Sequence, residues 1–249
     1  GFGLTLGGAG IGTISSIIGT GAGTLTKIGA GTWTLSSANT FSGGTTLSAG
    51  VLNINHTQAL GAVGGTFTIT AGTINNTSGS SISTLNYPMA WNGSFTFTGS
   101  NDLNLGTGAI TLGASVIATI TANNLTAGGT ISGSTFSITK AGNGTLSFGS
   151  NDVTISSLTL SAGTLVSTSG NLNLKGNFTN SAAFTHNSGT LSFTGTVAQT
   201  IGGTVVSQVY NNLVVNKSLA LTITGSTTTI TVNDFTNTLG SFTPPATFN

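Results

Sequence analysis

The feature that most constrains the fold is an internal repeat. The stretch GAGTLTKIGAGTWTLSSANTFSGGTTLSAGVLNI, Gly21–Ile54, returns without a gap in Phe136–Val166, 113 positions later. The shift places Lys27 on Lys140 and Gly31 on Gly144. A chain that repeats itself in this way is a stack of similar units, each too small to bury a core alone.

The units are made of short strands. The 39 glycines, together with many Thr, Ser and Asn residues, disfavour helix throughout the chain. Apolar and polar residues instead alternate with a period of two, as in Thr66–Thr70, Ser94–Thr98 and Leu221–Thr224. Runs of this kind, interrupted by Gly, Asn and Ser, predict half-buried strands.

The spacing of the strands predicts an all-β parallel β-helix, or β-solenoid, which we expect to be right-handed. Ser48–Asn53 is followed 22 residues later by Thr70–Asn75, with further copies at Ser161–Leu165 and, more loosely, Thr126–Ile131. A unit of about 22 residues is the size of one coil, so the chain supplies roughly 11 coils. At ~4.8 Å between strands, the rod is on the order of 55 Å long.

Two shorter patterns refine this expectation. Asn53 and Asn75 fall at equivalent corners, where we expect their side-chain amides to stack on one another. Gly189–Phe193 repeats Gly144–Phe148 at a spacing of 45, about two coils.

Antiparallel hairpins are the alternative architecture. The pairs Asn92-Gly93 and Asn143-Gly144 are dipeptides that favour tight hairpin turns. Two such pairs are few for a chain of β-sandwiches, which needs a turn signal every 8–12 residues. The solenoid is therefore the favoured prediction.

We expect one continuous solenoid over residues 1–243. Proline cannot donate to a strand ladder, so Pro244-Pro245 predicts that residues 244–249 are a boundary or linker. The chain begins at Gly1 and ends abruptly at Asn249, which suggests an excerpt of a longer protein.

Charge is almost missing. Charged residues make up 3% of the chain, with four lysines, three aspartates and a formal net charge of +1. So weak a field favours neither nucleic acid nor an anionic membrane, and no apolar run is long enough for membrane insertion. The absence of cysteine excludes disulfides and thiolate metal sites. Polar residues in place of charges are typical of an exported surface protein.

The charged residues predict turns rather than chemistry. Gly99–Leu103 and Gly149–Val153 are the same turn, in which Asp102 and Asp152 can bond nearby backbone, and Asp234 follows a similar Asn. A calcium site is the weaker interpretation, because Ca²⁺ needs six to eight oxygen ligands and these carboxylates are far apart in sequence. We expect no metal and no cofactor.

Catalysis is equally unsupported by the residues. β-Helix enzymes that cleave polysaccharides need paired carboxylates, or a basic residue beside bound calcium, and this chain has neither Glu nor Arg. His56 and His186 lie in polar turns and are interpreted as solvated or capping residues. We therefore predict no enzyme activity and no catalytic residue.

Two ligand-binding hypotheses remain. Tyr87, Trp91 and Asn92 border a stretch that interrupts the regular pattern, as inserted loops do, and are our candidates for contact with a ligand such as a glycan. Threonine pairs raise the possibility of ice binding, which requires such pairs on one face in every coil. The pairs, whose spacing is irregular, are Thr24/Thr26, Thr32/Thr34, Thr66/Thr68, Thr96/Thr98, Thr119/Thr121 and Thr222/Thr224.

Gly23–Ile54 resembles the passenger-associated repeat of autotransporter proteins, and a fainter copy lies near Phe136–Val166. It departs from the family pattern at Trp33, Ser37 and Phe41. The matching residues are Thr24, Leu25, Lys27, Gly29, Gly31, Thr32, Leu35, Ser36, Asn39, Thr40, Ser42, Gly43, Gly44, Thr45, Gly50 and Leu52.

Phe184–Asn216 is similar to a repeat of large, Gly- and Thr-rich surface adhesins exported by type IX secretion. The shared residues are Asn187, Gly189, Thr190, Phe193, Gly195, Gln199, Ile201, Gly202, Tyr210, Asn211, Asn212, Leu213 and Asn216. Both resemblances imply a non-enzymatic parallel β-helix on the bacterial cell surface, acting as a stalk or adhesin.

The expected partners follow from this interpretation. They are surface glycans, other cells, or further copies of the chain. A rod with open β ends and almost no charge lacks the usual protection against edge-to-edge pairing. Head-to-tail stacking through those ends would not close on itself and would give a filament.

Overall fold

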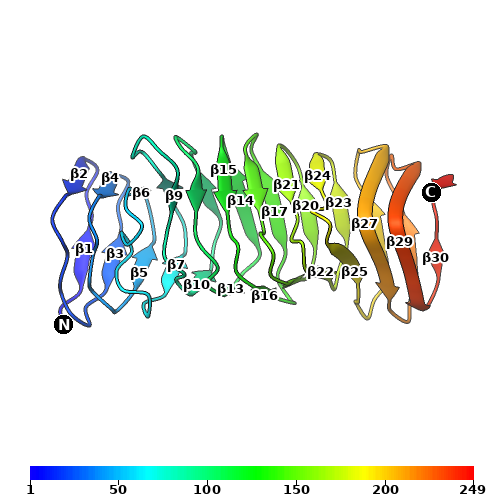
Figure 1. Cartoon of the computed structure of the whole chain (residues 1–249), viewed down its shortest axis with the longest axis horizontal. Helices are drawn as coiled ribbons and strands as arrows, with labels where there is room; N and C mark the ends of the chain where they lie inside the picture. Colours follow the sequence, from blue (N-terminus) through cyan, green and yellow to red (C-terminus); the bar gives the residue numbers. More distant parts are fainter.

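The computed structural model describes all 249 residues and contains 31 strands and no helix. The chain winds about 12 turns of about 21 residues each into a straight rod, with its ends at opposite tips (Figure 1). Every strand pair is parallel, as in Leu25 with Thr45 and Ile138 with Leu158. The predicted all-β parallel solenoid is confirmed, and the antiparallel alternative is wrong.

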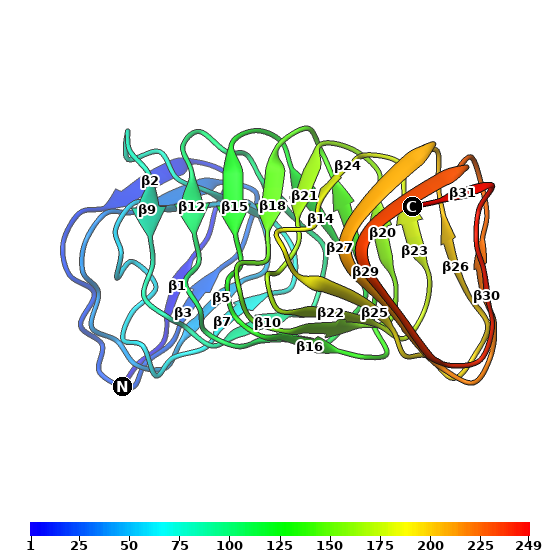
Figure 2. The same cartoon turned by 45° about the vertical axis from the view of Figure 1, so that its right-hand side comes forward.

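Three sheets form the sides of the rod (Figure 2). Sheet A contains β1 (Leu4–Leu6), β3 (Leu25–Lys27), β5 (Thr45–Leu47), β7 (Phe67–Ile69), β10 (Met89–Trp91), β13 (Ile110–Leu112), β16 (Ile131–Gly133), β19 (Val153–Ile155), β22 (Asn171–Leu174), β25 (Thr190–Phe193), β27 (Ser207–Asn216), β29 (Thr229–Leu239) and β31 (Thr247–Phe248). Sheet B contains β2 (Ile11–Ile14), β4 (Thr32–Leu35), β6 (Val51–Ile54), β8 (Thr73–Asn75), β11 (Phe95–Phe97), β14 (Val116–Ile120), β17 (Ile138–Ala141), β20 (Leu158–Leu160), β23 (Phe178–Asn180), β26 (Gln199–Gly202), β28 (Leu221–Ile223) and β30 (Phe242–Thr243). Sheet C contains β9 (Ile82–Ser83), β12 (Leu103–Asn104), β15 (Asn124–Thr126), β18 (Thr145–Ser147), β21 (Thr164–Val166) and β24 (Ala183–Thr185).

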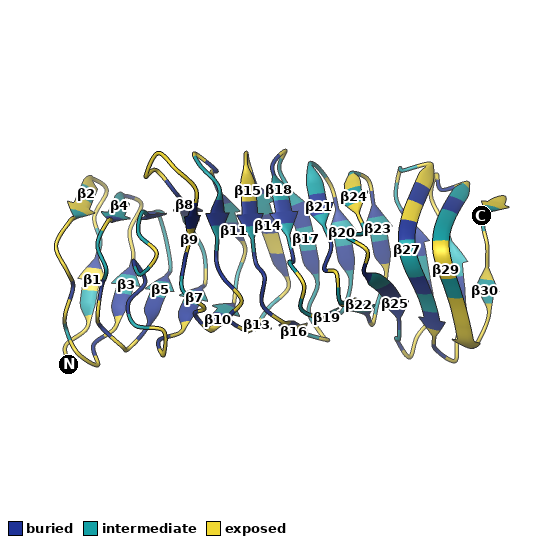
Figure 3. Cartoon of the chain, viewed as in Figure 1, coloured by how far each residue is buried: buried dark blue, intermediate teal, exposed yellow.

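The period-two pattern places the core inside the rod. In a typical three-residue strand the outer two side chains point inward and the middle one points out, as in Phe67-Thr68-Ile69. The inward residues form one core of 48 buried apolar residues. Figure 3 shows this burial recurring along the middle of the rod, whereas β2, β30 and β31 at the two tips are intermediate or exposed.

The sequence repeat is not a repeat of whole turns. Residues 25–54 place β3 and β5 in sheet A and β4 and β6 in sheet B. The matching residues 138–166 place β17 and β20 in sheet B, and β18 and β21 in sheet C. The second copy is therefore rotated around the rod by one sheet.

In two other repeats the second copy is also displaced around the rod by one sheet, in the same direction. Gly144–Phe148 supplies β18 of sheet C, whereas Gly189–Phe193 supplies β25 of sheet A. The spacing of 45 residues is thus two turns and one further side, which corrects the prediction of about two coils. Likewise Asp102 precedes β12 of sheet C and Asp152 precedes β19 of sheet A. The interchangeable unit is one strand with its corner, about a third of a turn.

Asn53 and Asn75 occupy equivalent positions, as predicted, since they are paired in register in sheet B. Their amides do not bond each other. Asn53 Nδ2 donates to Thr34 Oγ1 at 2.8 Å, and Asn75 Nδ2 donates to Ser100 Oγ at 2.9 Å. Each amide bonds a hydroxyl of a neighbouring turn instead.

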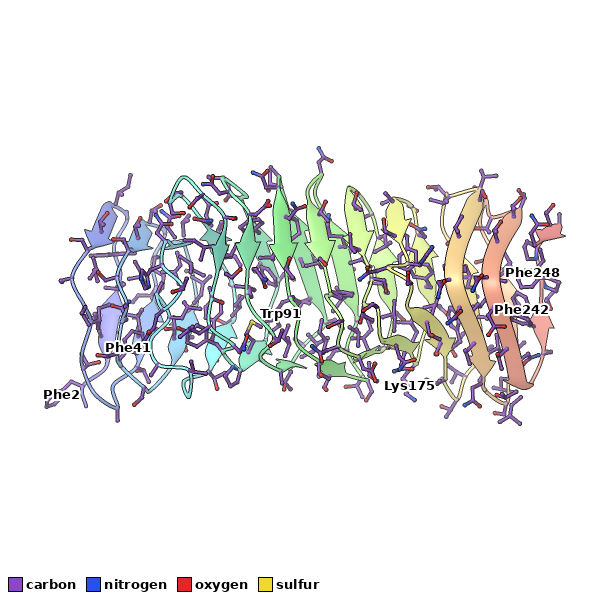
Figure 4. The ribbon with its side chains drawn as sticks, viewed as in Figure 1. Phe2, Phe41, Trp91, Lys175, Phe242 and Phe248 are labelled. Atoms are coloured by element: carbon purple, nitrogen blue, oxygen red, sulfur yellow. The ribbon has the colours of Figure 1, made fainter.

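At the C-terminal tip the ladder continues beyond the position where the sequence suggested a boundary. Pro244-Pro245 forms the corner between β30 and β31, where no ladder N–H is needed, and β31 pairs with β29. Phe242 and Phe248 pack edge to face there, with ring centroids 5.4 Å apart (Figure 4). At the other tip, Phe2 projects from the rod and is 90% exposed.

Candidate functional site

The repeated lysines are part of the corners. Lys27 ends β3, and its side chain is fully buried. Its Nζ donates to the carbonyl oxygens of Ile28, Gly29 and Ala49 at 2.8, 2.9 and 3.0 Å. Two of these acceptors belong to the same corner and the third to the next turn, so one amine satisfies three carbonyls and joins two turns.

Lys140 has the same environment on another side of the rod. Its Nζ donates to the carbonyl oxygens of Ala141, Gly142 and Ala162 at 2.9, 2.7 and 3.1 Å. Burial lowers the pKa of both amines, for Lys140 to about 8. Three aligned carbonyls are the arrangement that an ammonium group needs to be buried without a carboxylate.

Glycine is required where these amines sit. Gly50 and Gly163, each at φ +68°, are the residues that follow Ala49 and Ala162. A Cβ on Gly50 would lie 2.3 Å from Gly29 O and 2.6 Å from Lys27 Nζ. The Ala-Gly pair of the repeat therefore provides both the carbonyl and the space for the lysine.

A third lysine is used in a similar way. Lys217 is buried, and its Nζ donates to the carbonyl oxygens of Val197 and Ala220, at 2.6 and 3.0 Å. Burial lowers its pKa as well. Figure 4 shows Lys175, the remaining lysine, at the outer edge of the rod. The surface thus displays even less positive charge than the sequence contains.

The aspartates also join neighbouring turns. Asp102 accepts from the backbone N and the side-chain Nδ2 of Asn124, at 2.9 and 3.1 Å. Asp152 accepts from the same two groups of Asn171, at 2.8 and 3.1 Å. Both aspartates do accept from a backbone N–H, but it belongs to the next turn of the rod and not to the nearby backbone of their own corner, where the bond was predicted. No three His, Asp or Glu side chains come close enough together to hold a metal ion.

Each histidine caps its own turn, as expected. His56 Nδ1 accepts from Gln58 N, and His186 Nδ1 accepts from Ser188 N, both at 3.0 Å. These bonds hold each ring against its own turn through Nδ1.

The fold buries two of the three candidate ligand residues and leaves the third exposed. Tyr87 is buried and its hydroxyl donates to Gly61 O at 2.7 Å. Trp91 is fully buried, ends β10 and packs edge to face against Phe95 with centroids 5.0 Å apart. Neither ring is accessible to a ligand. Asn92 alone is exposed, at the corner between β10 and β11.

The threonine pairs do not share one face. Thr24/Thr26 and Thr66/Thr68 lie along sheet A, whereas the other four pairs lie along sheet B. Thr96 and Thr119 are in register, but Val51 interrupts the row between Thr32 and Thr73. A regular two-column array of threonines is therefore missing.

An open groove of about 350 Å³ runs along sheet C. Its polar lining includes Asp102, Asn104, Asn124, Thr126 and Thr145, which come from the adjacent strands β12, β15 and β18 and the corner before β12 (Figure 2). Sequence reasoning missed this groove, because hydroxyl and amide residues are common everywhere in the chain. Its amide, hydroxyl and carboxylate side chains can hydrogen-bond a polar ligand.

Comparison with known proteins identifies the repeats. Residues 25–54 and 138–166 match the family model of the passenger-associated-transport-repeat. The resemblance of these two segments to that repeat, inferred above from their residues, is therefore confirmed. The similarity of Phe184–Asn216 to type IX-secreted adhesins stays a prediction. No curated protein and no solved structure matches the chain significantly.

The repeats and the solenoid together fit an autotransporter passenger-like surface protein. Members of this repeat family are usually structural or adhesive rather than enzymatic, and are secreted or surface-exposed. No segment of the structure forms a helix long and apolar enough to cross a lipid bilayer.

Proposed function

We propose that this chain is a structural segment of an extracellular bacterial surface protein, a stiff stalk that holds an adhesive region away from the cell. The observation that carries the proposal is the use of its charged side chains. All four lysines, Lys175 through a longer and exposed bond of 3.4 Å, and two of the three aspartates bind atoms of a neighbouring turn. Charged side chains that are bonded in this way stiffen the rod, and few of them remain free to bind a ligand or a substrate.

A column of side chains supports the same conclusion. Ser115 Oγ accepts from Ser137 N at 3.0 Å, and Ser137 Oγ accepts from Ser157 N at 3.3 Å. Ser157 Oγ then accepts from Asn177 N, and Asn177 Oδ1 from Thr200 N, at 3.0 and 2.9 Å. The column extends the backbone ladder of sheet B beyond the strand ends. Thirteen strands in sheet A give a length on the order of 58 Å.

Surface display is tested by protease treatment of intact cells that produce the full-length parent protein. Peptides from this chain are expected in the supernatant before lysis, together with those of known surface proteins. A cytoplasmic marker serves as the control for leakage. Recovery of these peptides only after lysis would contradict the proposal.

A stalk must also resist extension. Pulling single molecules from both ends is expected to give a series of steps, each releasing about one turn of chain, because each turn contacts only its neighbours. Lys140→Met should lower the force of one step. Release of the whole chain at low force in a single event would rule out a load-bearing role.

Head-to-tail assembly into a filament is a second candidate. The small number of free charges favours it, because charge is a usual device against pairing of β edges. Electron microscopy of the protein with its flanking sequence, over a wide concentration range, distinguishes the two. Uniform fibres support assembly, and rods that stay monodisperse contradict it.

Carbohydrate binding is a third candidate, favoured by the sheet C groove. Apart from the Asp102 carboxylate, its polar side chains are amides and hydroxyls, which suit a neutral glycan. Binding to a glycan array should be lost in Asn104→Ala with Thr126→Ala and retained in Thr26→Ala, on sheet A. Equal loss in both variants would show that sheet C is not the binding face.

A further inference from the structure

The chain contains two Asn-Gly pairs, and they differ in one bond. Asn92-Gly93 lies between β10 and β11, and Asn143-Gly144 lies between β17 and β18. Both asparagines are exposed, and neither side chain has a hydrogen-bond partner. Gly144 N donates to Ile120 O at 2.8 Å, whereas Gly93 N makes no hydrogen bond. The two sites therefore differ at the glycine, whose N–H is bonded and whose backbone is buried at Gly144 but not at Gly93.

That nitrogen is the nucleophile in deamidation. After losing its proton, the glycine nitrogen attacks Cγ of the preceding asparagine, and Nδ2 leaves as ammonia. The product is a cyclic succinimide. One water molecule then opens the ring at either carbonyl and gives aspartate or isoaspartate. Glycine is the residue that least obstructs the attack, because it has no side chain.

We propose that Asn92 is a spontaneous modification site of the folded protein and that Asn143 is protected. The Gly144 N–H must leave the ladder before it can lose its proton, and the next amide, Thr145 N, is held as well, by Asn123 O at 2.8 Å. The Gly93 N–H makes no hydrogen bond, so it can lose its proton without first breaking one. Solvent water is the only co-reactant.

Glycine cannot be replaced at either site, so the chemistry is built into the fold. A Cβ on Gly93 would lie 1.9 Å from Thr70 O, and a Cβ on Gly144 would lie 2.8 Å from the backbone of Ala122. Crowding is thus common to both pairs. The difference between them lies in the hydrogen bond.

The product would change a surface that is almost uncharged. Each conversion adds one carboxylate and takes the formal net charge from +1 to 0. Isoaspartate also adds one carbon to the backbone between β10 and β11. The flanks of this corner are fixed by Asn92 N to Ile69 O at 2.8 Å and by Gly113 N to Trp91 O at 3.0 Å. The extra atom must therefore be absorbed at Asn92 itself, which loosens the corner.

The test is incubation of the folded protein in mildly alkaline, warm buffer made with oxygen-18 water. Ring opening incorporates the isotope, so each modified peptide is identified by mass. Chymotrypsin releases Asn92–Phe95, and trypsin with chymotrypsin releases Ala141–Leu146. We expect label at Asn92 to appear about fivefold faster than at Asn143, the factor that corresponds to ~1 kcal/mol for one hydrogen bond.

Incubation in denaturant is the matched control, because it removes the bond at Gly144. The two sites should then label at equal rates, and Asn92→Gln should abolish the signal at its own site alone. Faster or equal labelling of Asn143 in the folded protein would overturn the proposal. So would the absence of label at Asn92 in folded protein whose denatured form labels at both sites.

Discussion

Lys27 and Lys140 make the same set of three backbone hydrogen bonds although they lie in different sheets. Each amine reaches the carbonyls of the next two residues and one carbonyl 22 residues ahead. The environment is therefore created by the corner and the turn above it, not by a particular side of the rod. A duplicated segment can be placed on any side without losing its lysine contacts.

Removal of this amine should be costly. Lys140→Met keeps the length of the side chain but leaves three partly buried carbonyls without this donor, so we expect a loss of about 2 kcal/mol. Hydrogen exchange at Ser161 N and Thr164 N, which bond Lys140 O and Gly144 O, measures the loss locally. The control is Lys175→Met, on the exposed lysine, with an expected change within about 0.5 kcal/mol. Equal effects of the two changes would contradict the role of the corner.

The strands and the turn length could be predicted from the sequence, because a period of two and a Gly-rich corner are local signals. The rotation of the repeats could not. Turns differ in length, from 18 residues between Thr229 and Thr247 to 23 between Thr73 and Thr96. A spacing in sequence therefore does not specify a side of the rod.

The candidate ligand residues show a different limit of prediction from the sequence. The stretch around Tyr87, Trp91 and Asn92 suggested an inserted loop, yet Met89 and Trp91 pair with Phe67 and Ile69 in an ordinary strand of sheet A. The alternation of Met89-Ala90-Trp91 was the signal that could have placed the tryptophan in the core. The groove on sheet C depends on five successive turns, and no local pattern encodes it.

Stability should rise with pH between pH 8 and pH 10. Burial lowers the pKa of Lys140 to about 8 from 10.5, so in this range the unfolded chain holds a proton that the folded chain releases. The free energy of unfolding then increases with pH. Denaturant unfolding at several pH values measures it, with Lys140→Met as the variant in which the rise is smaller. A fall over this range would mean that the three carbonyls hold the ammonium more strongly than burial disfavours it.

Above pH 10 the trend should reverse. Burial raises the pKa of Tyr87 and Tyr210 from 10.0, so the unfolded chain loses these protons while the folded chain retains them. The folded state then binds more protons, and the free energy of unfolding falls as the pH rises. Tyr87→Phe should reduce this fall, as followed by denaturant unfolding. If ultraviolet absorbance showed both tyrosines of the folded protein ionising near pH 10, as free tyrosine does, the burial of these hydroxyls would be contradicted.

Glycine substitutions should have different effects at crowded corners and at open corners of the rod. Gly163→Ala puts a Cβ 2.4 Å from Gly142 O at a φ of +68°, and we expect it to cost about 2 kcal/mol or more. Gly64→Ala meets no atom within 4 Å and has no positive φ, so it should be neutral or slightly stabilising. Thermal unfolding of the two variants is the measurement. A neutral Gly163→Ala would show that the corner can shift to make room.

The aspartates should be replaceable by neutral acceptors. Asp102→Asn keeps an oxygen for Asn124 N, 2.9 Å away, whereas Asp102→Ala removes the acceptor from a partly exposed corner. We expect the first change to be nearly neutral and the second to cost about 1 kcal/mol, the worth of an ordinary hydrogen bond. Hydrogen exchange at Asn124 N reports the difference directly, and Asp234→Ala, at an exposed position in β29, is the matched control. If Asp102→Asn were as damaging as Asp102→Ala, the charge itself would matter, and the groove on sheet C would have to be reconsidered as a site for a cationic ligand.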